Sequence, residues 1–131
     1  MKKYKKISFV LSLALILGLM GNVNANATTE WAMTFPTAKF AKTDWDHYEY
    51  YGGGNASISL TRIVEGPSYY CNAQAVNSNN EARSSYELCL QGDGYNTLRN
   101  VSMTTGNQYY VRAYNDYFET SYRWAYGKFS F

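Results

Sequence analysis

The sequence predicts an all-β protein, a single antiparallel β-sandwich of about seven to eight short strands that follows an N-terminal signal peptide. Three observations favour this fold class. Tyr, Thr, Val and Ile are frequent, and these residues suit pleated, half-buried strands. Leu and Ala seldom recur at helical spacing. Turn signals rich in Gly, Asn and Ser recur every roughly 10 to 14 residues, as in a sandwich or barrel of short strands.

Residues 1–27 have the organisation of a signal peptide. The basic stretch MKKYKK precedes an apolar run over residues 7–20, which is shorter than the roughly 20 residues of a membrane span. Ala25 and Ala27 then form the small-x-small pattern that signal peptidase cleaves. We expect a secreted domain made of residues 28–131, and an uncleaved N-terminal anchor is the alternative.

Loss of this segment changes the charge of the protein. The whole chain has a formal net charge of +2, but four of its lysines lie in MKKYKK. Residues 28–131 keep 8 Lys and Arg against 10 Asp and Glu, a net charge of −2. A nucleic-acid partner needs a clustered basic stripe, whereas the remaining arginines are scattered. The sequence therefore argues against nucleic acid as a partner.

Residues 28–131 suffice for one domain with a modest core. Each expected strand is a run of β-forming residues bounded by turn signals such as GGGN at 52–55, NSNN at 77–80 and GDG at 92–94. The eight expected strands lie at residues 31–35, 47–51, 57–64, 69–76, 84–91, 97–104, 108–114 and 121–129.

The two cysteines are expected to form a structural disulfide. Cys71 and Cys89 are equidistant from Asn80, so a hairpin that turns in NSNNEA places them directly opposite each other. Opposed residues of an antiparallel pair are close enough for a disulfide, and exported proteins usually pair their cysteines. A redox or metal pair is the alternative, although the spacing is not that of a CxxC motif and the chain has one histidine.

The residues that carry enzyme chemistry are sparse, so we expect neither catalysis nor a cofactor. The only histidine, His47, lies in DWDHYEYY beside Asp44, Asp46 and Glu49. This stretch lacks the Asp, Asn and Gly spacing of an EF-hand calcium loop. It reads as a solvated acidic turn, with a looser oxygen-ligand site as the alternative. No base beside a nucleophile and no defined carboxylate pair is recognisable.

The aromatic C-terminus is the main candidate for a binding surface. Folding QYYVRAYN onto SYRWAYGKF around DYFET makes a hairpin in which alternate side chains share one face. In this register Arg112 faces Trp124, which suggests a cation–π contact. The expected face consists of Tyr110, Arg112, Tyr114, Tyr122, Trp124 and Tyr126.

Two interpretations of these rings stay open. They could be core, with Arg112 extending its charged end past a buried stem, and a slip of one residue would regroup every side chain. They could instead be exposed, because a central arginine without a partner is costly in a core. Exposed contiguous rings usually form a contact surface, here for cell-wall glycan, a lipid surface or another extracellular protein.

The export signal, SISLTR and the closing YYVRAYND and YRWAYGKFSF resemble a family of small secreted proteins of Gram-positive bacteria whose domain has no assigned function. The resemblance implies a compact β-sandwich outside the cell and no catalytic residue. A second likeness, in size, export signal and aromatic C-terminus, is to the lactococcin 972-type bacteriocins, which are secreted β-sandwiches active at the envelope of competitors.

Three functions follow in order of preference. The first is a non-enzymatic extracellular binding module with an aromatic face. The second is a secreted, bacteriocin-like protein that acts at the cell envelope. A small extracellular hydrolase comes third, because no arrangement of base and nucleophile is recognisable.

Overall fold

The protein is an all-β sandwich, which confirms the predicted fold class. The computed structural model describes residues 28–37, 40–66, 70–115 and 121–131, and these form eight strands. Five of the predicted ranges match a strand to within two residues, whereas the predicted range 47–51 covers only part of a longer β2 and the range 84–91 extends beyond a shorter β5. The strands are β1 (Thr29–Phe35), β2 (Lys42–Tyr50), β3 (Ser57–Ile63), β4 (Tyr70–Val76), β5 (Glu87–Leu90), β6 (Asn96–Thr97), β7 (Gln108–Tyr114) and β8 (Arg123–Ser130).

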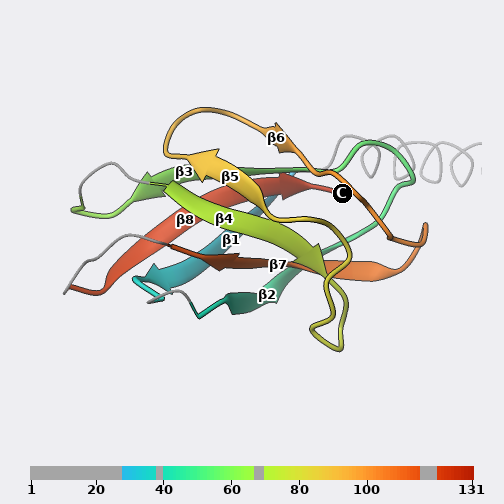
Figure 1. Cartoon of the computed structure of the whole chain (residues 1–131), viewed down its shortest axis with the longest axis horizontal. Helices are drawn as coiled ribbons and strands as arrows, with labels where there is room; N and C mark the ends of the chain where they lie inside the picture. The colour runs from blue at the N-terminus through green and yellow to red at the C-terminus, as the bar shows by residue number, and fades with distance from the viewer. Residues whose placement is uncertain (1–27, 38–39, 67–69, 116–120) are drawn as a thin grey trace, which may run out of the picture.

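The strands form two antiparallel four-stranded sheets (Figure 1). Sheet A has the order β1-β8-β3-β6, and sheet B has the order β2-β7-β4-β5. The inward side chains of both sheets form one apolar core, as expected for packed sheets about 10 Å apart. Its largest fully buried side chains include Trp31, Phe35, Ile58, Leu60, Val111 and Phe129.

Strand β7 illustrates why these residues form strands. Its burial alternates without interruption, with Tyr109, Val111 and Ala113 inward and Tyr110 and Arg112 partly exposed. This period of two is the pattern of a strand with one face in the core and one outside. The pattern predicts which side chains of a strand share a face, but it does not identify the neighbouring strand.

Trp31 of β1 is a fully buried side chain of the core on the inner face of sheet A. It lies opposite Gly127 of β8, and its indole Nε1 donates a hydrogen bond of 3.0 Å to the carbonyl of Ser59 on β3. The ring can cross β8 only because residue 127 has no side chain. A Cβ atom there would overlap both the Ser59 carbonyl oxygen and the Trp31 indole.

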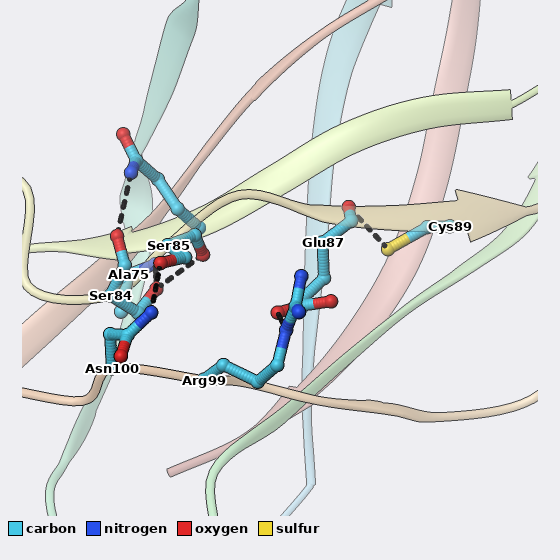
Figure 2. A network of polar contacts seen from close by, with 8 residues as sticks. Ala75, Ser84, Ser85, Glu87, Cys89, Arg99 and Asn100 are labelled. Atoms are coloured by element: carbon cyan, nitrogen blue, oxygen red, sulfur yellow. Dashed lines mark hydrogen bonds and ion pairs between the residues drawn. The ribbon is translucent and has the colours of Figure 1, made fainter.

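The predicted strand over residues 97–104 is wrong except at its start, because only Asn96–Thr97 is extended and paired. Asn100 has a left-handed φ of 52°, which ends a strand. Residues 99–102 are instead joined to residues 83–87 by both backbone and side-chain hydrogen bonds. The backbone N–H of Ser85 donates to the Arg99 carbonyl at 3.0 Å. Asn100 Nδ2 donates to Ser85 Oγ at 2.8 Å, and Arg99 Nε donates to Glu87 Oε1 at 2.7 Å (Figure 2).

The predicted disulfide is also wrong. Cys71 and Cys89 are opposite each other on β4 and β5, as expected, but both are buried free thiols. The Cys89 Sγ points back along its own strand and lies 3.6 Å from the carbonyl of Glu87 (Figure 2). Two cysteines that lie opposite each other in a sheet therefore do not always form a disulfide, because the bond also requires both side chains to point toward each other with a suitable geometry.

The two thiols nevertheless interact. A hydrogen bond between them and their burial raise the pKa of the Cys71 thiol, whereas the same hydrogen bond lowers the pKa of the Cys89 thiol.

The signal segment, with its expected cleavage site at Ala25 and Ala27, lies outside the described residues. Export and secretion therefore stay predictions. Within the ranges that the structure describes, no helix has the length and apolarity that crossing a membrane requires.

Candidate functional site

The six residues predicted to share one face are divided between the two sheets. Strand β7 pairs with β2 and β4, whereas β8 pairs with β1 and β3, so the predicted hairpin is wrong. The chain passes from sheet B to sheet A between Asn115 and Tyr122. The alternation within each strand was predicted correctly. The outer side chains are Tyr110, Arg112 and Tyr114 on sheet B and Trp124 and Tyr126 on sheet A, while Tyr122 is exposed just before β8.

Arg112 does not contact Trp124. Its guanidinium donates hydrogen bonds from Nε to Gln74 Oε1 at 2.8 Å and from Nη1 to the carbonyl of Asn80 at 2.7 Å. The predicted cation–π pair is therefore wrong. A different pair takes its place on sheet A, where the guanidinium carbon of Arg62 lies 5.1 Å from the ring centre of Tyr126.

Four rings gather on the outer face of sheet B, and we call them the aromatic cluster: Trp45, Tyr48 and Tyr50 of β2 and Tyr110 of β7. The ring centres of Trp45 and Tyr110 are 4.9 Å apart, those of Tyr48 and Tyr110 are 6.0 Å apart, and those of Tyr48 and Tyr50 are 5.9 Å apart. The three rings of β2 are each about half exposed. Of the predicted residues, only Tyr110 belongs to this cluster.

A β-bulge in β2 explains why sequence reasoning missed three of these rings. Asp44 pairs with Val111 and Glu49 pairs with Tyr109, so β2 has three extra residues over this interval. Asp44 and Glu49 are both buried although they are five residues apart, which strict alternation forbids. The sequence carries no signal for this bulge, because the burial of Asp44 and Glu49 is known only from the structure.

Asp44 fixes the bulged strand to the other sheet. Its carboxylate accepts hydrogen bonds from the backbone N–H of Ala32 on β1 at 2.8 Å and of Asp46 at 3.0 Å, and it contacts His47 Nδ1 at 2.7 Å. The predicted solvated acidic turn is therefore wrong at this position. Asp44 instead joins the edge strand of sheet A to the edge strand of sheet B.

A groove of about 440 Å³ lies along this junction between β1 and β2. Its lining includes Thr34, Lys42, Trp45, Asp46, His47 and Trp124. Trp124 lies opposite Thr34 in the sheet, is about half exposed, and stacks on Tyr126 with ring centres 6.2 Å apart. The groove therefore has an exposed indole from each sheet and hydrogen-bonding side chains between them.

The polar groups of the groove are held in place by the fold. Lys42 Nζ donates to the side-chain and backbone oxygens of Thr34 at 3.0 and 3.3 Å. The contact with Asp44 orients the imidazole of His47, a pairing that also orients catalytic histidines. In the described part of the chain, no group of three or more His, Cys, Asp or Glu side chains is arranged to hold a metal ion.

A second pocket, of about 580 Å³, lies beyond the other end of the aromatic cluster. Polar side chains dominate its lining, which includes Asn77, Arg83 and Gln108. Tyr50 belongs to both the pocket and the cluster, and its hydroxyl accepts a hydrogen bond of 3.0 Å from Gln108 Nε2.

No family model, curated protein or solved structure matches this chain. The resemblance to small secreted proteins of Gram-positive bacteria therefore stays a prediction, and the function is inferred from the side chains of the site.

Proposed function

We propose that this protein is an exported, non-enzymatic binding module that holds a glycan against its aromatic cluster. The observation that carries the proposal is that Trp45 and Tyr48 both contact Tyr110 on an outer sheet face, outside the apolar core. Tyrosine and tryptophan present large, rigid, amphipathic surfaces, and exposed contiguous rings usually mark an interaction site.

The chemistry around the rings favours a sugar over a lipid. A pyranose has an apolar C–H face that can lie on an aromatic ring and hydroxyl groups that need donors and acceptors. Asp46, His47 and Thr34 supply such groups in the groove beside Trp45. A surface for anionic lipid would instead require clustered cations, and residues 28–131 carry a net charge of −2.

The proposal is tested by titrating the purified domain with soluble wall polysaccharide and following tryptophan fluorescence. Trp45→Ala should weaken binding about thirtyfold, the effect of removing a hot-spot side chain of about 2 kcal/mol. Tyr95→Ala provides the matched control, since this ring is about half exposed but lies outside the cluster. Equal affinity of Trp45→Ala and the wild type would overturn the proposal, as would binding to anionic vesicles with none to polysaccharide.

A further inference from the structure

The row of aromatic rings on sheet B continues past the edge of that sheet onto sheet A. From Tyr50 they continue through Tyr48 and Tyr110 to Trp45 with ring centres 4.9 to 6.0 Å apart. Trp45 and Trp124 then line the same groove, and Trp124 stacks on Tyr126 on the outer face of sheet A. We call this row the aromatic strip: Tyr50, Tyr48, Tyr110, Trp45, Trp124 and Tyr126.

We propose that the aromatic strip binds one linear polysaccharide chain whose consecutive sugar units pass across sheet B, around the β1–β2 edge and onto sheet A, with the groove as the middle subsite. This inference rests on the proposed function and extends it from one surface to a series of subsites. The spacing of the rings is similar to the length of one sugar unit, so neighbouring rings can each support a different unit.

The groove has the character of a central subsite. Trp45 lies at one side and Trp124 at the other, and each comes from a different sheet. Between them, the carboxylate of Asp46 can accept from hydroxyl groups, and the imidazole of His47 is already oriented by Asp44. Because Asp44 and Lys42 tie β2 to β1, the two indoles are held on one rigid frame. Little conformational freedom is therefore lost on binding.

The shape of the aromatic strip favours a linear polymer over a membrane or a peptide as the ligand. The outer faces of the two sheets point away from each other, so a flat bilayer cannot contact both. A peptide that adds as a strand needs free backbone groups at a sheet edge. At the edge strand β1, the N–H of Ala32 already bonds to Asp44 of β2. A flexible linear glycan can follow the bend without using backbone groups of the protein.

The test uses soluble fragments of the peptidoglycan glycan strand, from a disaccharide to an octasaccharide, with binding measured by calorimetry. For the wild type, affinity should rise at least about tenfold as the fragment becomes long enough to reach both sheets, because linked subsites act together. Trp45→Ala should weaken the binding of every fragment, because the shortest ones lie on the aromatic cluster to which Trp45 belongs. Trp124→Ala should weaken only the fragments that are long enough to cross the groove from the cluster onto sheet A.

Tyr122→Ala is the matched control for Trp124→Ala. This ring is more exposed than Trp124 and lies two residues away, but no ring contact in the described residues joins it to the strip. Its replacement should leave the length dependence unchanged. Binding that depends on Trp45 but is indifferent to Trp124 and to length would overturn this inference and leave the proposed function intact. Binding that is indifferent to both tryptophans would overturn both.

Discussion

At the scale of single residues, the fold depends on one position that has no side chain. Gly127 lies beneath the indole of Trp31, and this allows the indole to reach the Ser59 carbonyl across β8. Trp31 is fully buried, so it has no room to move away from a larger residue. The constraint at Gly127 is one of space and not of backbone conformation.

We therefore expect Gly127→Ala to destabilise the domain by about 3 kcal/mol or more, at the upper end of the usual cost of overpacking a core. Denaturant unfolding measures this change. Gly54→Ala is the control, because a Cβ atom at residue 54 meets nothing within 4 Å. Equal stability of the two variants would show that Trp31 can be displaced cheaply.

Replacing Trp31 or Trp124 with alanine should reduce the stability of the domain by different amounts. Trp31 is fully buried, whereas Trp124 is about half exposed on the outer face of sheet A. Trp31→Ala should lower the free energy of unfolding by about 3 to 5 kcal/mol, and Trp124→Ala by about 1 kcal/mol or less. Unfolding curves, with quenching of fluorescence by iodide, check both. A Trp124 that is shielded from iodide and whose loss unfolds the domain would mean that this ring belongs to the core.

At the scale of elements, β2 is the strand that joins the fold to the site. Its bulge turns Trp45 and Tyr48 outward, and Asp44 in the same bulge bonds to β1. The backbone donors of Ala32 and Asp46 depend on this one carboxylate. The groove should therefore lose its shape if Asp44 is removed.

Asp44→Ala should destabilise the domain by about 2 to 4 kcal/mol, because hydrogen bonds to a charged acceptor contribute about 1.5 to 3 kcal/mol each and two partly buried backbone donors lose their acceptor. The matched control is Asp46→Ala, two residues along the same strand and exposed, which should change stability by about 0.5 kcal/mol or less. Thermal unfolding of the two variants gives the comparison. A larger loss in Asp46→Ala would contradict the role given to Asp44.

At the scale of the whole molecule, Glu49 connects the sheets at the other end of the bulge. Its carboxyl group accepts a hydrogen bond of 3.0 Å from the backbone N–H of Phe131, which follows β8. Burial raises the pKa of Glu49 from its ordinary value of 4.5 to about 7, against the opposing effect of this hydrogen bond. The folded state therefore holds a proton that the unfolded chain releases at lower pH.

The sign of the effect on stability follows from these two values. The contribution of Glu49 is fully present below its unfolded pKa of 4.5 and is lost as pH rises through about 7. We expect the free energy of unfolding to fall by up to about 3 kcal/mol between pH 5 and pH 8, since one pKa unit corresponds to about 1.4 kcal/mol. Glu49→Gln should flatten this profile, and Glu30→Gln, on exposed β1 surface, should not. A wild-type profile that rises over this interval would contradict the prediction.

Most of the strands and the division of β7 into inner and outer side chains were predictable, because hydrophobic period and turn signals act over a few neighbouring residues. The partners of the strands were not. The predicted pairing of Arg112 with Trp124 assumed that strands consecutive in the sequence are neighbours in the sheet. In the structure β7 pairs with β4, and β8 pairs with β3. The aromatic cluster was missed for the same reason, since a bulge is visible only against its partner strand. The sequence correctly predicted that the two cysteines lie opposite each other. The orientation of their sulfur atoms depends on the packing of the surrounding side chains, which the spacing of the cysteines in the sequence does not determine.

The shortness of β5 and β6 has a consequence for how the molecule opens. β5 has four residues and β6 has two, and the segments around them are joined to their neighbours by isolated backbone hydrogen bonds, such as that from the Ser85 N–H to the Arg99 carbonyl, and by side-chain hydrogen bonds (Figure 2). Their amide hydrogens should exchange with solvent through local opening, ahead of the amides of β7 and β8, which exchange only on global unfolding. This opening would expose Cys89 on β5 while the β1–β2 edge and its groove stay folded. In hydrogen-exchange mass spectrometry, β8 should therefore remain protected long after β5 has exchanged.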